Sequence, residues 1–205
     1  PEKVFAVTRL WADSNPNTHR AVLMALLEAC RWLDEPSNRR AACELLSHGR
    51  YVNTPVDVLE KSLTGTLQFS SDEQPRAAPD YNVFQRYAAN FPWRSQAIWF
   101  LSQMVRWGQV SGPLAYEQIA DAVYRPDLYR TAAAALGLSC PDDDHKLEGQ
   151  HAVDWELPAG GGAIPMGPDL FMDGRPFDWR AAGDYAQSFA PGLPADERKA
   201  AETAG

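Results

Sequence analysis

Residues 90–109 read NFPWRSQAIWFLSQMVRWGQ and contain the clearest secondary-structure element that this sequence predicts. Pro92 suits the first turn of a helix, and Gly108 is a typical residue just beyond a helix end. Between them the apolar side chains recur at helical spacing, so the pattern predicts an amphipathic helix over residues 93–107. The recurring residues are Ile98, Leu101, Met104 and Val105.

Further helices are predicted on both sides of this one. Their boundaries come from the same signals, an Asn, Thr or Pro at the start and a Gly or Pro at the end. Residues 66–79 (TLQFSSDEQPRAAP) are polar and contain two prolines, which predicts a loop. The predicted helical ranges are 16–34, 37–47, 55–63, 81–89, 114–124 and 126–136.

The first residues form a short β-type run over residues 4–8 (VFAVT) with no second run nearby to pair with it. A lone strand of this length is not stable without a partner. We therefore expect the chain to continue a structure that begins upstream, and an isolated fragment to expose an apolar face.

The amino-acid composition changes after Ser139, where prolines and glycines become frequent. A long irregular stretch is unusual inside a compact domain. The sequence therefore predicts three regions: residues 1–138, which are mainly helical; residues 139–168, which are irregular; and residues 169–205, a docking segment with a tail.

Composition limits the possible functions. The chain has 205 residues, 45% hydrophobic and 22% charged, which is typical of a globular protein, and its net charge is −8. An acidic chain argues against nucleic acid as a main partner, because a phosphate backbone needs a basic surface. The three cysteines form no zinc-binding spacing, and no apolar run reaches the length of a membrane span.

Several residue groups are candidate chemical sites, and for each the structural interpretation is favoured. Residues 142–145 (DDDH) suggest a cation site, but an exposed acidic loop explains them better. The glycines at 160–162 lack the strand and the Gly-Lys-Ser/Thr of a phosphate loop, which favours a linker. The cysteines on helix faces are expected to be buried, and the arginines and tryptophans of residues 91–108 are expected to pack an amphipathic helix.

Several stretches together resemble nitrate-type substrate-binding proteins of ABC transporters. The resemblance rests on residues 15–19 (NPNTH), 27–34 (LEACRWLD), 90–109 and 132–138 (AAAALGL), and extends to about residue 190. It implies an α/β type-II periplasmic-binding fold with two lobes and hinge strands. Such proteins are about twice this length, so the resemblance implies the C-terminal half, predominantly α-helical with few short strands, with residues 4–8 as a hinge strand.

The resemblance also implies a function without a catalytic step or a cofactor. The implied function is to bind a small oxyanion on the periplasmic side of the membrane for an ABC permease. Nitrate is the first candidate, and nitrite or bicarbonate come next. Lys3 matches a lysine near the hinge that contacts the anion, and most of the other contacts would lie in the missing N-terminal half. The alternatives are a cytoplasmic nitrate or nitrite sensor that binds a regulatory protein, and an enzyme derived from this fold.

Overall fold

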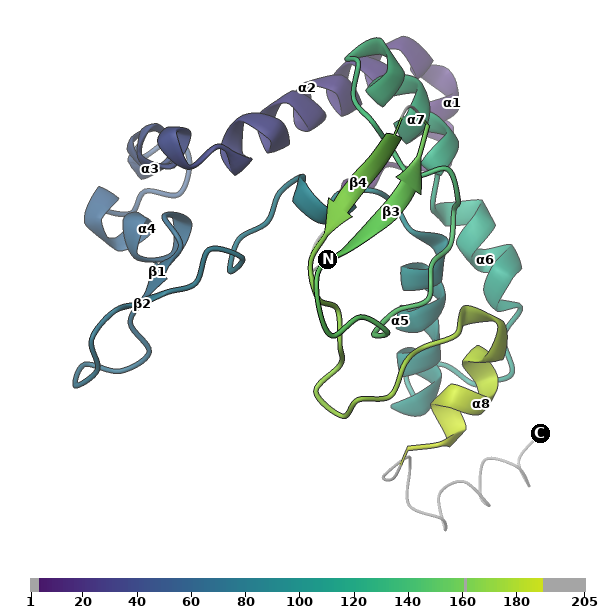
Figure 1. Cartoon of the computed structure of the whole chain (residues 1–205). Helices are drawn as coiled ribbons and strands as arrows, with labels where there is room; N and C mark the ends of the chain where they lie inside the picture. Colours follow the sequence, from purple (N-terminus) through teal and green to yellow (C-terminus); the bar gives the residue numbers. More distant parts are fainter. Residues whose placement is uncertain (1–3, 161, 190–205) are drawn as a thin grey trace. The chain divides into compact units, whose positions relative to one another are not determined.

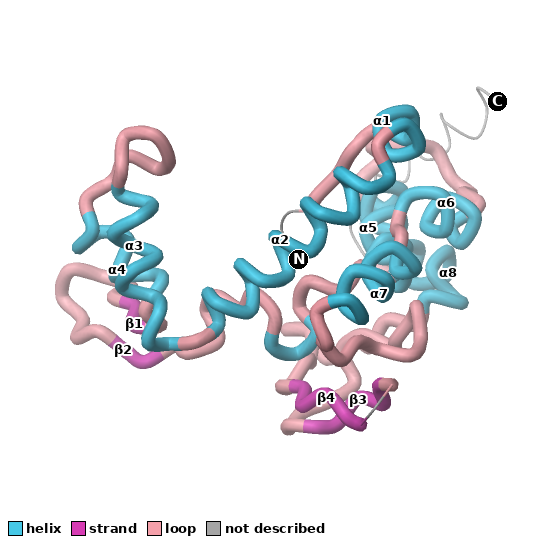
Figure 2. Tube along the Cα trace, turned by 90° about the horizontal axis from the view of Figure 1, so that it is seen from above, coloured by secondary structure: helices cyan, strands magenta, loops and turns pink. Residues whose placement is uncertain are grey.

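The computed structural model describes residues 4–160 and 162–189. It divides into two compact units. The first comprises Pro1–Asn90 with Ala132–Leu138, and the second comprises Phe91–Thr131 with Ser139–Gly205. Helices dominate the described part, and its strands form only two short hairpins (Figures 1 and 2). This confirms the prediction of a predominantly helical chain with few short strands.

The first unit is built on one long helix. Its elements are α1 (Arg9–Ser14), α2 (Pro16–Asp34), η1 (Pro36–Asn38), α3 (Arg39–Ser47), α4 (Val56–Leu63), β1 (Thr66–Leu67), β2 (Arg76–Ala77) and η2 (Arg86–Ala88). Thr8 caps α1, because its side-chain oxygen accepts the N–H of Trp11 at 3.2 Å. Pro16 opens α2 as predicted.

Two expectations for the first unit differ from the structure. Residues 81–89 form only the single 3-10 turn η2 instead of a helix, since Tyr87 and Ala88 adopt positive φ angles of 60° and 49°. The predicted loop at 66–79 contains β1 and β2, which pair antiparallel over two residues each. Residues 4–8 pair with no strand in the described part of the chain, where the sequence also predicts no partner for them, and their role as a hinge strand stays a prediction.

The second unit packs around α5 (Arg94–Arg106), which begins and ends within a residue of the predicted boundaries. Its other elements are α6 (Tyr116–Val123), α7 (Pro126–Ala135, whose last turn belongs to the first unit), β3 (Trp155–Ala159), β4 (Gly162–Met166), η3 (Trp179–Ala181) and α8 (Ala182–Gln187). Helices α6 and α8 both lie against α5. Ile98 and Phe177 are fully buried in the core between them.

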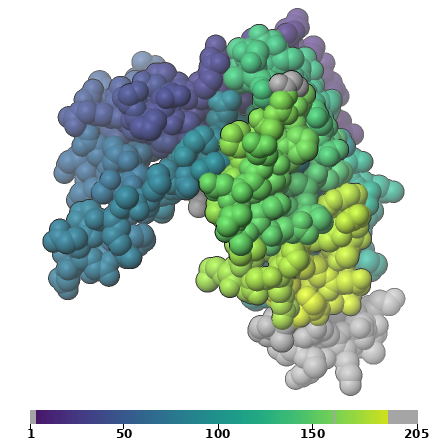
Figure 3. All heavy atoms as spheres, viewed as in Figure 1, coloured from purple at the N-terminus to yellow at the C-terminus, as the bar shows by residue number. Residues whose placement is uncertain are grey.

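A hairpin corrects the prediction that residues 139–168 are irregular. Strands β3 and β4 pair antiparallel from Trp155 opposite Met166 to Ala159 opposite Gly162. The sequence does not predict these strands because each contains a proline, Pro158 or Pro165. Proline argues against a strand, since it is tolerated only where a strand lies at a sheet edge. Figure 3 shows the described residues after 139, coloured green to yellow, in contact with one another on the face in view.

Candidate functional site

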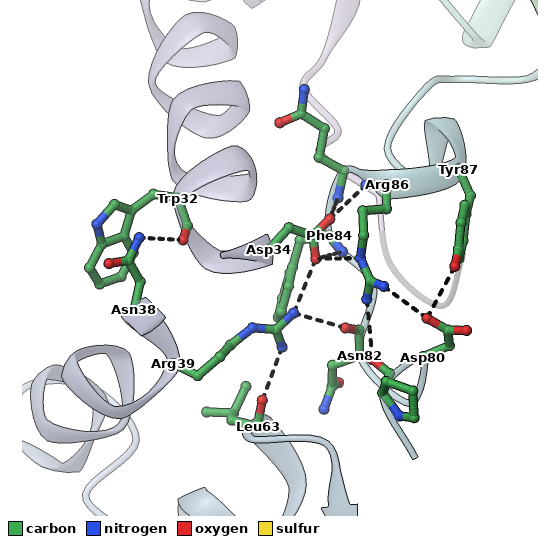
Figure 4. Close-up of polar contacts among 12 residues, drawn as sticks. Trp32, Asp34, Asn38, Arg39, Leu63, Asp80, Asn82, Phe84, Arg86 and Tyr87 are labelled. Carbon is green, nitrogen blue, oxygen red and sulfur yellow. Dashed lines mark hydrogen bonds and ion pairs between the residues drawn. The ribbon is translucent and has the colours of Figure 1, made fainter. Parts of the chain in front are cut away.

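The first unit contains a buried carboxylate, Asp34, at the end of α2 (Figure 4). Its Oδ2 accepts the backbone N–H groups of Gln85 and Arg86, each at 2.6 Å. Its Oδ1 accepts the N–H of Phe84 at 3.1 Å. Successive N–H groups that converge in this way form an anion-binding concavity. In this chain the concavity is filled by the protein's own carboxylate.

Two guanidinium groups complete this Asp34 cluster. Nη2 of Arg39 lies 3.1 Å from Asp34 Oδ1, and Arg39 also donates to the carbonyls of Leu63 at 3.0 Å and Asn82 at 3.1 Å. Nε of Arg86 lies 3.7 Å from Asp34 Oδ1. The Asp34 and Arg39 side chains are each only 8% exposed. The cluster joins two chain segments that lie far apart in the sequence. Because the converging N–H groups already bind the carboxylate of Asp34, the cluster offers no vacant anion site.

In the second unit Asp144 lies between two arginines. Its carboxylate accepts Nη1 of Arg94 and Nη1 of Arg130, each at 2.6 Å, and its carbonyl accepts the N–H of Arg94 at 2.9 Å. A carboxylate neutralised by two cations is a poor ligand for a metal ion. No group of three His, Cys, Asp or Glu side chains that could hold a metal was found among the described residues.

His145, the last residue of the DDDH sequence, stacks on Trp179 with ring centroids 4.2 Å apart. Burial is the main cause that lowers the pKa of this imidazole, while Asp144 acts in the opposite direction. The ring is therefore held in its neutral form more strongly than a free histidine. Its Nε2 is buried and has no hydrogen-bond partner among the residues that the structure describes.

A second polar group, which the sequence did not predict, surrounds Glu148. Ser95 donates to Glu148 Oε1 at 3.1 Å, and Lys146 contacts the other carboxylate oxygen. Lys146 Nζ also lies 3.8 Å from Asp169 Oδ2. The Lys146 and Glu148 side chains are 10% and 11% exposed. Their charges compensate each other, and the hydrogen bond from Ser95 connects the loop at Glu148 to α5.

His151 extends this polar group. Its Nδ1 lies 3.2 Å from Asp169 Oδ2, and its ring stacks on Trp155 with centroids 3.8 Å apart. A histidine oriented by a carboxylate is a familiar arrangement in general-base catalysis. No cysteine or serine lies within hydrogen-bonding distance of this ring among the interactions of the described chain. We therefore assign the pair no catalytic role.

Of the two cysteines on helix faces, the prediction of burial is confirmed for Cys43 and not for Cys30. Cys43 is fully buried, and Cys30 and Cys140 are half-buried. Burial is the main cause that raises the pKa of all three thiols. A thiol with a raised pKa is protonated at neutral pH and is a weak nucleophile.

Some of the aromatic residues of 91–108 pack the second unit, as favoured from the sequence, whereas Phe100 and Trp107 are 40% and 57% exposed. Phe91 and Trp93 are 2% and 1% exposed, and their rings meet edge to face with centroids 4.7 Å apart. Gly160 and Gly162 lie at the end of the hairpin where β3 leads into β4. Gly162 has a φ of 151°, which only glycine adopts readily, so the backbone conformation at this position favours glycine.

Lys3, the residue proposed to contact an anion, lies outside the described residues. The structure therefore describes neither its surroundings nor its partners.

None of the described helices combines the length and apolar character needed to cross a bilayer.

Comparisons with known proteins identify the relatives of this chain. A model of the NMT1-like family matches residues 1–47. The nitrate/nitrite binding protein NrtA of Nostoc sp. is 30% identical over 189 residues, which are 92% of this chain and 39% of that protein. The bicarbonate-binding protein CmpA of Synechococcus elongatus is 30% identical over 196 residues, 92% of this chain and 40% of that protein.

Two further comparisons concern a transporter subunit and a solved structure. The nitrate import ATP-binding protein NrtC of Synechocystis sp. is 34% identical over 151 residues, 74% of this chain and 22% of that protein. The crystal structure of the periplasmic nitrate-binding protein NrtA from Synechocystis aligns with a TM-score of 0.72 and 26% identity. That alignment covers 87% of this chain and 42% of the other.

The fold of this chain is therefore that of part of a periplasmic binding protein. The chain is similar to nitrate- and bicarbonate-binding proteins over most of its length. It spans about two fifths of the length of the binding proteins that it matches.

Proposed function

We propose that these 205 residues form part of the substrate-binding component of an ABC importer for a small oxyanion, with nitrate as the first candidate. The observation that supports this most strongly is the shared fold with a nitrate-binding protein over 87% of the chain. Nitrite and bicarbonate are the next candidates. All three are small planar oxyanions, and one misplaced donor or acceptor in a buried site would distinguish them.

The proposed mechanism is binding followed by closure, without a chemical step. An anion bound between two lobes favours the closed form, and a permease would recognise that form at the periplasmic side of the membrane. The similarity to the ATP-binding protein NrtC supports a partner of the ABC type. The relatives NrtA, CmpA and NrtC are named for binding or import and not for sensing, so the cytoplasmic sensor gains no support.

Lys3 is the residue that we propose contacts the anion in this chain. An ammonium group supplies a positive charge and three hydrogen-bond donors. The net charge of −8 is unfavourable for long-range attraction of anions. Screening limits that effect to about 8 Å at physiological ionic strength, so a lysine beside the anion outweighs distant carboxylates.

The test is calorimetric titration of the complete polypeptide that contains these residues with nitrate, nitrite and bicarbonate. It is repeated with Lys3→Ala and with Lys61→Ala, an exposed lysine of α4, as the matched control. We expect Lys3→Ala to weaken nitrate binding about ten-fold or more, roughly 1.4 kcal/mol. Lys61→Ala should leave the affinity unchanged.

The outcomes distinguish the identity of the bound anion from the role of Lys3. Nitrate binding that both variants retain would preserve the function and remove Lys3 from the site. Tight binding of bicarbonate alone would change the ligand within the same class. Absence of heat with all three anions, for a protein shown to be folded, would contradict the proposal.

A further inference from the structure

Two arginines of the second unit lie over the same aromatic ring. The guanidinium carbon of Arg106, at the end of α5, is 4.0 Å from the centroid of the Phe189 ring. The guanidinium carbon of Arg175 is 4.9 Å from the same centroid. A cation within about 6 Å of an aromatic centroid is attracted to the face of the ring. Phe189 therefore holds two positive charges close together.

These two arginines differ from the other basic residues of the second unit. Within its described residues, each other arginine and Lys146 form an ion pair with a carboxylate, whereas Arg106 and Arg175 form none. The pairs are Arg94 and Arg130 with Asp144, Arg125 with Asp127, Lys146 with Glu148, and Arg180 with Asp178. Carboxylates are plentiful in a chain with a net charge of −8. The position around Phe189 is therefore a local excess of positive charge.

Most hydrogen-bond donors of the two guanidinium groups remain available. Nη1 of Arg106 donates to Oε1 of Gln103 at 3.1 Å, and Nη1 of Arg175 donates to the carbonyl of Ser188 at 3.2 Å. Within the described residues neither Nη2 group donates a hydrogen bond, and Nε of Arg106 is buried without a partner. Because a guanidinium has five N–H donors in a planar fork, the pair can donate several hydrogen bonds to a ligand.

A ligand can reach the pair from solvent. Arg175 is exposed and Arg106 is partly exposed. Trp107, whose ring centroid lies 5.0 Å from the guanidinium carbon of Arg106, is 57% exposed. Asp173 accepts the backbone N–H of Arg175 at 3.1 Å, but among the described interactions it forms no ion pair with either guanidinium. No described carboxylate therefore occupies the position of an anionic ligand.

We propose that Arg106 and Arg175 form a binding site for a phosphate group. A phosphate carries close to two negative charges at neutral pH, and its oxygens accept paired hydrogen bonds from a guanidinium fork. Its charge would offset the repulsion between two cations that are held on one ring. Nitrate carries a single charge, so it matches the pair less well than phosphate does. Free phosphate and the headgroup of a phospholipid both present this chemistry.

The test measures binding of both forms of phosphate to the complete polypeptide that contains these residues. Inorganic phosphate is titrated calorimetrically in a buffer free of phosphate and sulfate. Vesicles that contain equal parts of phosphatidylcholine and phosphatidic acid are used in a sedimentation assay, with pure phosphatidylcholine vesicles for comparison. Neither experiment contains nitrate, and Lys3→Ala should leave both results unchanged, so the outcome is independent of the function proposed above.

Two substitutions identify the site. Arg106→Gln and Arg175→Gln should each weaken binding about ten-fold or more, which is roughly 1.4 kcal/mol. Arg180→Gln is the matched control, because it removes an exposed arginine of the same unit that already pairs with Asp178, and it should leave binding unchanged. Since Arg175 is exposed, its variant keeps the test valid if Arg106→Gln does not fold.

The results decide both the site and the source of the phosphate. Binding of inorganic phosphate that the two glutamine variants weaken would support the proposal with free phosphate as the ligand. Binding of vesicles with phosphatidic acid alone, weakened by the same variants, would support it with a lipid headgroup as the ligand. Absence of binding in both experiments would contradict the proposal. Equal weakening by Arg180→Gln would also contradict it, because only the overall charge would then matter.

Discussion

Asp34 connects the end of α2 to the segment of residues 84–86 in the first unit. Its buried carboxylate accepts three backbone N–H groups and faces the guanidinium groups of Arg39 and Arg86. Asp34→Asn keeps the shape but leaves Arg39 buried without its countercharge, so we expect a loss of about 3–5 kcal/mol. Urea unfolding followed by circular dichroism measures this loss.

The control for Asp34 is a carboxylate of the same unit in an exposed ion pair. Glu44 lies 3.3 Å from Arg40, and both side chains are more than half exposed. Glu44→Gln should cost less than about 1 kcal/mol, because solvent screens such pairs. Equal losses in Asp34→Asn and Glu44→Gln would show that the Asp34 cluster contributes nothing beyond a surface charge.

The pH dependence of the second unit should depend partly on His145. Burial lowers the pKa of its imidazole from 6.5, so the unfolded chain binds a proton at this position more readily than the folded chain. The contribution of neutral His145 to the free energy of unfolding is therefore fully present above the unfolded pKa. It is lost as pH falls through 6.5 toward the lower folded pKa. His145→Phe keeps a ring against Trp179 without a titrating group, and its stability should fall less than that of the natural sequence between about pH 7.5 and 5.5.

The comparison cancels the effect of the other histidines, because they are present in both proteins. Urea midpoints are measured at intervals of about half a pH unit. Parallel pH profiles for the two proteins would contradict the role given to His145.

At the scale of elements, Gly149 determines how the loop around Phe171 lies on α5. It has a φ of 80°, and an added Cβ would lie 2.7 Å from the Phe171 ring, which itself stacks on Trp99 at 6.2 Å. Gly149→Ala therefore combines backbone strain with a steric clash, and we expect it to cost about 2–4 kcal/mol. Thermal unfolding of the variant checks this value.

Gly174 in the same unit provides the control for the clash. It has a φ of 68°, but nothing lies within 4 Å of an added Cβ. Gly174→Ala should therefore cost only the strain, about 1 kcal/mol. If both variants lose the same stability, the Phe171 ring moves aside and does not fix the loop.

Local signals predict some elements well and leave others hidden. Helix α5 could be predicted almost to the residue, because Pro92, Gly108 and the apolar spacing all agree. The β3–β4 hairpin is hidden because its prolines and glycines imitate a linker. The Asp34 cluster joins residues about 50 positions apart, and no local pattern reports such a contact. The type-II fold follows from the resemblance and not from periodicity.

At the scale of the whole molecule, the division into two units leads to a prediction about how stability is distributed. All contacts of the Asp34 cluster lie within the first unit, and those of Gly149 lie within the second. Separate cooperative units open with separate free energies. Asp34→Asn should therefore accelerate amide exchange in residues 16–90 and leave residues 91–131 unchanged, whereas Gly149→Ala should affect residues 91–131 and 139–189 only. Hydrogen–deuterium exchange of both variants, compared peptide by peptide, tests this. If each variant accelerated exchange in both units to a similar degree, the chain would be a single cooperative unit, and its stability could not be assigned to the two clusters separately.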